Sequence, residues 1–426
     1  MENKYSLSPY RWVVLIALMA VTLVIELQWL AHAAVARAAA VFYAGQFNPD
    51  SLFNIDFLAL SYMLVFLVMS IPASYIIDTK GIKPGIGIGC ILTGLFSLLK
   101  GFGASSFKIV LIAQIGLAIA QPFILNGVTA LSVRWFPVNE RGTAAGLAAL
   151  AQYLGIIAAM GITPLLVVSS PQNPNYGKGI DSMLMIYGIA SAVIAFAAFF
   201  LLKEKPAVPP SKESYTHSKF TEGFKYIFTR PDMIITILLF FIGLGIFNAV
   251  SSMVDSISGS LGVLDSNGMI GVFMIIGEVI EALILPVLSD KFRKRKLFLV
   301  INMAGMIPAL AGLAFANRLF GSPDTVYGCA LVSSFLLGFF VMSAGPIGFQ
   351  YAAEVSYPAP ESSSQGFLLL AGQITGIVFV ALMSMKSNQY LGKMMVLFTI
   401  LSVISFILVL FIKESPMIRD DKQKKD

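Results

Sequence analysis

The sequence predicts an all-α integral membrane protein whose 12 transmembrane helices form two pseudo-symmetric six-helix bundles. Three observations predict this fold class. The composition is too apolar for a water-facing surface, the apolar segments are long enough to cross a bilayer, and a charged motif recurs half a chain length later. Together they exclude a large soluble enzyme.

The composition is that of a chain that lies mostly in lipid. Of the 426 residues, 57% are apolar without counting glycine, and only 12% are charged. A soluble globular protein is about 45–50% apolar with glycine included and about 25% charged. The apolar runs are continuous and do not alternate with polar residues, which excludes a transmembrane β-barrel. The net charge of +6 is therefore interpreted as a marker of membrane orientation and not of nucleic-acid binding.

Twelve apolar segments meet the length of a membrane helix, which needs roughly 20 residues to cross a hydrocarbon core about 30 Å thick. They cover residues 12–36, 56–77, 85–103, 107–133, 143–168 and 182–202 in the first half and 231–254, 267–289, 297–316, 326–353, 364–385 and 391–412 in the second. A polar, lysine-rich stretch separates the halves. We therefore expect an N-terminal bundle over residues 1–202, a cytoplasmic linker over 203–230, and a C-terminal bundle with a basic tail over 231–426.

The basic residues predict the orientation of these spans. With the N-terminus inside, 22 of the 29 lysines and arginines fall on the cytoplasmic side, where such residues are enriched. The other seven, Arg37 and Lys100 among them, fall outside. An odd number of spans would place the C-terminal lysines outside as well. We therefore expect a multi-pass protein of the plasma (inner) membrane with both termini in the cytoplasm.

A charged motif follows the second span of each half. The first copy is Asp78-Thr-Lys80-Gly81-Ile-Lys83, and the second, 212 residues later, is Asp290-Lys291-Phe-Arg293-Lys294-Arg295. A repeat of this kind is typical of transporters built from two related halves around a midplane site. An acidic residue at a helix C-terminus is disfavoured by the macrodipole and needs a cationic partner. We predict a gating network from Asp78, Lys80, Gly81, Arg141, Asp290 and Arg293; the alternative is that these charges only fix topology.

The first copy, and the run Arg134-Trp-Phe-Pro-Val-Asn-Glu140-Arg141-Gly142 between the fourth and fifth spans, resemble loop motifs of the major facilitator superfamily. That resemblance covers nearly the whole chain and implies the major facilitator fold.

A narrower resemblance rests on Glu-Leu-Gln28-Trp29, Ser61-Tyr62-Met-Leu, Ala120-Gln121-Pro, the segment Pro346 to Pro358, and Gln373-Ile-Thr-Gly-Ile-Val-Phe. These segments are similar to the feline leukaemia virus subgroup C receptor-related family, which is associated with choline and ethanolamine transport and with reported haem transport. The resemblance implies that Trp29, Gln121 and Gln373 match substrate-cavity positions. The chain departs from it at Asn248, where the choline carriers have a tyrosine. A cage for a quaternary ammonium needs several aromatic faces, so this departure weakens the expectation for choline itself.

The first span concentrates polar residues on one helix face. Glu26, Trp29 and Arg37 recur at helical spacing and fall within about 80° of one another, and His32 lies one turn beyond Trp29. Polar groups inside a span are expensive and need a reason. The functional interpretation is a cavity wall, with His32 as a proton relay. The alternatives are that Trp29 packs against a neighbour, that Arg37 reaches the outer interface, and that His32 is structural.

Amide side chains recur near the middle or inner part of several spans. Gln114 and Gln121 are seven residues apart and share a helix face, and Pro122 is expected to bend that helix. Amides bind a polar solute without a fixed charge, although they also bond neighbouring helices together. We predict a substrate-binding set made of Trp29, Gln121, Gln152, Asn248, Gln350 and Gln373.

The eighth span carries two carboxylates, Glu278 and Glu281, three residues apart. Two acids this close in a low dielectric do not both ionise readily, which makes them a candidate protonation site. The alternative is an ion pair with a base on another helix, or a wet outer vestibule. We predict proton coupling through Glu26, His32, Glu278 and Glu281.

The favoured function is a secondary active or facilitative transporter that moves a small polar or amine-bearing solute by alternating access. If the transport is coupled to an ion, we expect a symporter. The sequence contains no P-loop, no metal-ligand cluster and no Cys/His nucleophile pair, so we expect neither an enzyme nor a cofactor. We expect a monomer coupled to H⁺ or Na⁺ or to no ion. The alternatives are a carrier of a larger amphipathic anion such as haem or another carboxylate, with Arg37 and His32 as contacts, and a membrane receptor that transports nothing.

Overall fold

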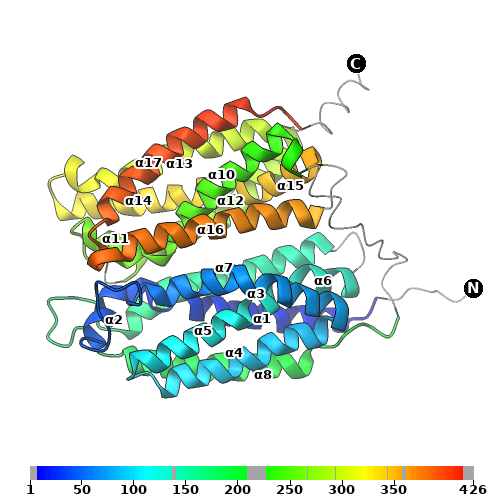
Figure 1. Cartoon of the computed structure of the whole chain (residues 1–426), viewed down its shortest axis with the longest axis horizontal. Helices are drawn as coiled ribbons and strands as arrows, with labels where there is room; N and C mark the ends of the chain where they lie inside the picture. The colour runs from blue at the N-terminus through cyan, green and yellow to red at the C-terminus, as the bar shows by residue number, and fades with distance from the viewer. Residues whose placement is uncertain are drawn as a thin grey trace, which may run out of the picture. The chain divides into compact units, whose positions relative to one another are not determined.

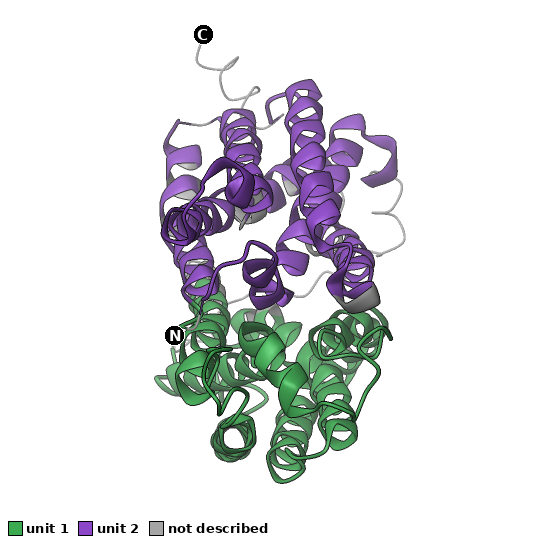
Figure 2. Ribbon diagram, turned by 90° about the vertical axis from the view of Figure 1, so that its left-hand side faces the viewer, with its two compact units in different colours: residues 1–215, 266–268 green, residues 216–265, 269–426 purple. Residues whose placement is uncertain are grey.

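The computed structural model describes residues 7–136, 141–208, 227–265, 267–292, 294–342, 344–356 and 361–415. Within these ranges the chain forms helices joined by turns, with no β-strand. It divides into two compact units (Figure 2). Unit 1 comprises residues 1–215 and 266–268, and unit 2 comprises residues 216–265 and 269–426.

Unit 1 contains the first six predicted spans. Its helices are α1 (Tyr10–Leu30), the 3-10 turn η1 (Ala33–Val35), α2 (Ala36–Phe42), α3 (Phe57–Lys80), α4 (Ile82–Phe102), α5 (Phe107–Leu125), α6 (Gly127–Trp135), α7 (Arg141–Leu166) and α8 (Ile180–Leu201) (Figure 1). Each predicted span corresponds to one of these helices or to two in succession.

Unit 2 contains the other six predicted spans. Its helices are α10 (Pro231–Ser252), α11 (Val254–Ser260), α12 (Met269–Phe292), α13 (Arg295–Leu319), α14 (Pro323–Met342), α15 (Ala344–Ser356), α16 (Glu361–Asn388) and α17 (Leu391–Phe411). The prediction of an all-helical membrane protein is confirmed.

The two units repeat one packing scheme. In unit 1, α1 packs along α7, α3 along α5, and α4 along both α5 and α8. In unit 2 the equivalent pairs are α10 with α16, α12 with α14, and α13 with both α14 and α17. The repeated motif in the sequence therefore corresponds to a repeated arrangement of helices.

The lengths of the helices fit a bilayer. Among the described residues, eleven helical stretches are long and apolar enough to cross a membrane. The remaining predicted span, residues 267–289, is α12, whose 24 residues include the two glutamates. At 1.5 Å per residue, α12 is also longer than the roughly 30 Å hydrocarbon core.

Within the described residues, three predicted spans are interrupted, which corrects the sequence-based boundaries. The first span stops at Leu30 and resumes at Ala36 after the η1 turn. The seventh, its counterpart in unit 2, stops at Ser252 and resumes at Val254. The fourth stops at Leu125, three residues beyond Pro122, in line with the bend expected there. Apolar periodicity does not reveal such breaks, because the residues on both sides remain apolar.

Glycines bring the fifth span of unit 2 close to its neighbour. A Cβ atom placed on Gly245 of α10 would lie 2.6 Å from the Thr375 Cβ of α16, and one on Gly372 would overlap Leu244. The Gly372-x-x-x-Gly376 pattern therefore marks a close helix approach. A second pattern of this kind, Gly142-Thr-Ala-Ala-Gly146, begins α7. A Cβ atom placed on Gly146 would have no heavy atom within 4 Å, so a close approach does not occur at that glycine.

Candidate functional site

A buried carboxylate, an amide and two aromatic rings meet inside unit 1. Glu26 and Trp29 lie one turn apart on α1, Tyr62 lies on α3 and Gln121 on α5, and all four side chains are buried. Gln121 Nε2 donates a hydrogen bond of 3.0 Å to Glu26 Oε1. The Tyr62 hydroxyl is buried and has no hydrogen-bond partner among the described residues. Three helices thus bring together four side chains, which we call the Glu26 cluster.

The two rings of the Glu26 cluster are fixed relative to each other. Trp29 and Tyr62 stack with ring centroids 6.4 Å apart and an interplanar angle of 27°. The indole Nε1 donates to the Ala59 carbonyl oxygen at 3.1 Å, which holds the ring orientation. Such ring faces attract cations. Tyr62 was not among the predicted site residues, although it belongs to the Ser61-Tyr62 segment on which the family resemblance rests.

Helix α7 approaches the Glu26 cluster closely. A Cβ atom on Gly155 would lie 3.0 Å from the Glu26 Cβ and would overlap the Leu23 carbonyl oxygen. Gln152, one turn earlier on α7, is half-buried. The second carboxylate oxygen, Glu26 Oε2, is buried and accepts no hydrogen bond from the described residues. This oxygen is therefore a buried acceptor without a partner in the described part of the chain.

The other polar residues of this region have different roles. Gln114 donates its Nε2 to the carbonyl oxygens of Gln28, Trp29 and Leu58 at 3.3, 3.4 and 3.1 Å, so it ties α1 to α3. His32 follows the end of α1, and within the described part of the chain neither nitrogen of its buried ring has a hydrogen-bond partner. Arg37 lies half-buried on α2. The predicted roles of His32 and Arg37 remain predictions.

In unit 2, two of the predicted amides lie on neighbouring helices. Asn248 is buried on α10 and Gln373 is partly buried on α16, next to the close approach at Gly245 and Gly372. The Asn248 Nδ2 and the Gln373 Oε1 are buried, and neither forms a hydrogen bond within the described residues. A free donor and a free acceptor on adjacent helices are compatible with their predicted role in binding a polar solute.

A buried aspartate, Asp265, precedes α12, and the helix carries the predicted pair of glutamates. The Asp265 carboxylate accepts hydrogen bonds from the backbone N–H groups of Met269 and Ile270, at 2.8 and 2.9 Å, and from the Tyr327 hydroxyl at 3.0 Å. Burial nevertheless raises the pKa of Asp265. Further along the helix, Glu278 and Glu281 are both buried, as expected for acids that share a helix face.

A carboxylate binds the backbone N–H groups at the start of α4 in unit 1. The Glu204 carboxylate, two residues beyond the end of the sixth span, accepts hydrogen bonds from the Ile82 and Lys83 N–H groups at 3.2 and 2.8 Å. It also forms an ion pair with Arg134 at the end of α6. The first turn of a helix binds anions through its free N–H groups and its dipole. Glu204 lies at the start of the predicted cytoplasmic linker and contacts α4 and α6 of unit 1.

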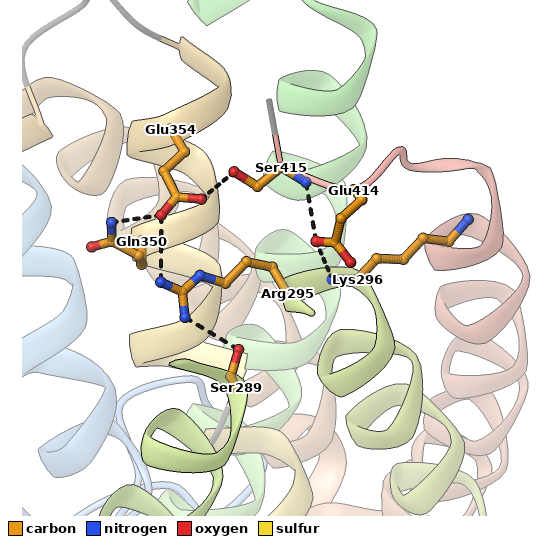
Figure 3. A network of polar contacts seen from close by, with 7 residues as sticks. All are labelled: Ser289, Arg295, Lys296, Gln350, Glu354, Glu414 and Ser415. Atoms are coloured by element: carbon orange, nitrogen blue, oxygen red, sulfur yellow. Dashed lines mark hydrogen bonds and ion pairs between the residues drawn. The ribbon is translucent and has the colours of Figure 1, made fainter. Parts of the chain in front are cut away.

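Unit 2 has a related but larger network (Figure 3). Arg295, at the start of α13, lies 3.4 Å from Glu354 of α15 and donates to the Ser289 hydroxyl at 3.2 Å. Glu354 also accepts a hydrogen bond of 2.8 Å from Gln350 and one from the Ser415 hydroxyl. The Lys296 N–H donates to Glu414 at 3.2 Å, which repeats the contact between Glu204 and the start of α4. Gln350, predicted to bind substrate, therefore lies in a charged network.

The structure describes the predicted gating residues only in part. Lys80 ends α3 and is exposed, and Gly81 separates α3 from α4 with a left-handed φ of +114°. Arg293 lies outside the described residues, and the structure describes the backbone but not the side chains of Asp78, Arg141 and Asp290. Sequence reasoning missed Glu204 and Glu414. The available signal was the Lys-Glu pair at 203–204 that recurs at 413–414.

Substitution of Gly81 by alanine is expected to destabilise unit 1. A Cβ atom there would overlap the Glu204 carboxylate, and the positive φ disfavours any side chain. We expect a loss of about 1–3 kcal/mol, seen as a fall of several degrees in the melting temperature of the purified protein. Gly146→Ala is the matched control, because that helical glycine faces open space and alanine favours helix. Equal melting temperatures for both variants would contradict the role assigned to Gly81.

The family of the chain follows from comparison with known proteins. Residues 15–381 match the model of the Major Facilitator Superfamily, a range that includes the Glu26 cluster, Asn248 and Gln373 of unit 2, and Glu354. The chain belongs to the Major Facilitator Superfamily. As a member of this superfamily it is a multi-pass membrane transporter and not an enzyme, and both predictions are confirmed.

Within the Major Facilitator Superfamily, several curated relatives align over most of the chain. Solute carrier family 49 member A3 of Xenopus tropicalis is 30% identical over 89% of this chain and 78% of its own length. The choline/ethanolamine transporter FLVCR1 of Felis catus is 26% identical over 91% of this chain and 70% of its own. The choline/ethanolamine transporter FLVCR2 of Rattus norvegicus is 25% identical over 89% and 69%. The resemblance stated from the motifs is therefore confirmed.

Solved structures of other transporters have a similar fold. A bacterial homologue of the human lysosomal transporter Spinster, in an inward-facing and unoccupied conformation, aligns with a TM-score of 0.72 at 15% identity over 95% of this chain and 97% of that one. The D-xylose–proton symporter aligns with a TM-score of 0.72 at 13% identity over 96% and 99%. At these identities the similarity concerns the fold alone.

Proposed function

We propose that this transporter moves a small amine-bearing organic solute, and that a protonated primary amine such as ethanolamine suits it better than choline. The observation that carries this proposal is the Glu26 cluster. A buried carboxylate with a free oxygen lies beside an amide and a stacked pair of aromatic rings. A cation is the natural partner of such a carboxylate, because a charge buried in the membrane interior needs compensation.

The choice of a primary amine rests on the kind of acceptor present. A primary ammonium has N–H groups that can donate to Glu26 Oε2, whereas a quaternary ammonium has none and depends on aromatic faces. The Glu26 cluster supplies two such faces, Trp29 and Tyr62. At position 248 the choline carriers that this chain resembles have a tyrosine, and this chain has an asparagine.

Uptake of labelled solutes into proteoliposomes tests the proposal. We expect the wild-type protein to take up ethanolamine faster than choline. Asn248→Tyr is expected to raise choline uptake relative to ethanolamine by about 2–30-fold, the range that one added cation–π contact of roughly 0.5–2 kcal/mol supplies. Asn302→Phe, an aromatic replacement of another buried amide of unit 2, is the control and leaves the ratio unchanged.

Other results would contradict the proposal. Uptake of haem but of neither amine, with a loss in Arg37→Ala, would support the carrier of an amphipathic anion. Absence of uptake of every solute, together with melting temperatures that no solute shifts, would support a receptor that transports nothing. An unchanged choline-to-ethanolamine ratio in Asn248→Tyr would remove position 248 from the solute path while leaving the Glu26 cluster to be tested separately.

A further inference from the structure

A fully buried lysine lies against the interrupted end of α1. Lys100, on α4, is 0% exposed. The topology count places it among the outward-facing basic residues, but its side chain points into unit 1. Lys100 Nζ donates to the backbone carbonyl oxygen of Gln28 at 3.1 Å and to the side-chain Oε1 of the same residue at 3.0 Å. Within the described residues, Lys100 forms no ion pair with a carboxylate.

The neighbouring residues fix the oxygen atoms that Lys100 contacts. The Gln28 amide donates its Nε2 to the Ser191 hydroxyl of α8 at 3.1 Å, which turns Oε1 toward Lys100. Gln114 of α5 donates to the same Gln28 carbonyl and to that of Trp29. Both carbonyls belong to the last turn of α1, whose C-terminal end lacks helical hydrogen-bond partners. Three helices therefore provide donors or fixed oxygens at the point where α1 stops.

The chemistry of this arrangement is that of a cation site. The end of a helix carries a partial negative charge, and oxygen atoms of unwound backbone hold coupling cations in transporters with broken helices. An ammonium group has three donors and a compact charge, and two of its donors are used here. Among the described residues Lys100 has no ion pair with a carboxylate, so the carbonyl oxygens at the end of α1 compensate the charge of its ammonium group.

We infer that Lys100 is a built-in cation: its ammonium takes the place that a free monovalent cation would hold at the broken end of α1. This charge holds the last turns of α1, and with them Glu26 and Trp29, in position. Lys100 is thus a positioning residue, and the wild-type protein needs no Na⁺ at this place. The inference rests on the proposed function only for its effect on solute uptake; its effect on stability is independent of the solute.

Melting temperatures of the full-length protein test this inference directly. Lys100→Ala removes the charge and leaves space, so we expect a lower melting temperature than that of the wild type. About 0.1 M methylammonium or Na⁺ should raise the melting temperature of this variant by several degrees above its value in the same concentration of the bulky N-methylglucamine. Lys100→Met removes the charge but fills the space, and no cation should restore it. Lys108→Ala, at an exposed position, should behave as the wild type does.

The outcomes are distinct. Selective recovery of Lys100→Ala by small cations supports the built-in cation. Equal responses of Lys100→Ala and Lys108→Ala, or a wild-type melting temperature for Lys100→Ala in N-methylglucamine, overturn it. If Lys100→Ala does not fold in any buffer, Lys100→Gln decides, because glutamine keeps a hydrogen-bond donor without the charge. Its melting temperature should fall below that of the wild type, and equality would overturn the inference.

Uptake gives a second measurement. Ethanolamine uptake by Lys100→Ala should fall about tenfold and recover at least in part with the same small cations, since a tenfold change corresponds to a modest loss of positioning. If the wild-type protein takes up no amine at all, the proposed function fails, but the melting experiment still tests the built-in cation. If uptake is normal and Lys100→Ala shows no loss in N-methylglucamine, the inference is wrong and the proposed function stands.

Discussion

Replacement of Glu26 by glutamine is expected to lower ethanolamine uptake by about 100-fold, because removal of one partner of a buried, hydrogen-bonded charge pair costs roughly 2–5 kcal/mol. Glutamine has nearly the shape of glutamate, and its amide oxygen can still accept the hydrogen bond from Gln121. The fold of unit 1 should therefore survive while the charge is lost. Initial rates of uptake into proteoliposomes, at equal protein content and with melting temperatures as a check on folding, measure the effect.

A charge-swapped variant provides the matched control for Glu26→Gln. In the double variant Glu26→Gln/Gln121→Glu, the carboxylate moves to the other side of the same 3.0 Å hydrogen bond. We expect uptake within about tenfold of the wild type, because the net charge of the Glu26 cluster is restored. Retention of more than half of the wild-type rate in Glu26→Gln would show that this carboxylate does not balance the charge of the solute. Equal losses of uptake in the single and double variants would show that the carboxylate functions only at position 26.

The limits of the spans could be predicted from the sequence, whereas the interruption of the first span could not. Helix starts such as Phe57 and Phe107 agree with the apolar segments to within a residue or two. The break after Leu30 has no glycine or proline near it, and Ala31 to Val35 continue the apolar pattern. That break coincides with hydrogen bonds from Lys100 and Gln114, which lie about 70 and 85 residues away in the sequence. Local propensity carries no record of such contacts.

The Glu26 cluster could be predicted in part. The helical spacing of Glu26 and Trp29 placed them on one face, and their burial agrees with this. Gln121 was a candidate from its spacing to Gln114, from the adjacent Pro122 and from the family resemblance. Its hydrogen bond to Glu26 could not be predicted, because it depends on how α1 and α5 pack. Tyr62 was missed because a tyrosine in an apolar span is usually a packing residue. Glu204 was missed because a glutamate in a lysine-rich stretch is typical of a solvated surface, and its contact with α4 is tertiary.

Replacement of Glu278 by glutamine is expected to abolish uptake driven by a proton gradient but to preserve exchange of solute. Glu278 is buried on α12 with Glu281 three residues further along the same helix. Two neighbouring carboxylates in a low dielectric hold a proton more readily than one exposed acid does. A glutamine imitates the protonated form permanently, so steps that need release of the proton stop. Exchange of labelled for unlabelled ethanolamine needs no net proton movement and continues.

Two transport assays test the effect of Glu278→Gln. The first assay measures uptake driven by an imposed pH difference, and the second measures exchange at equal pH on both sides. Both assays are done in the same proteoliposomes for the wild type, Glu278→Gln and the control Glu414→Gln. Glu414 lies beyond the last span, where it accepts a hydrogen bond from the Lys296 N–H, and the glutamine amide oxygen can accept the same bond. Its variant should keep both activities. If Glu278→Gln responds to pH as the wild type does, α12 carries no coupling proton at this residue. Loss of exchange together with gradient-driven uptake would instead mean that Glu278 supports the helix and does not couple transport to protons.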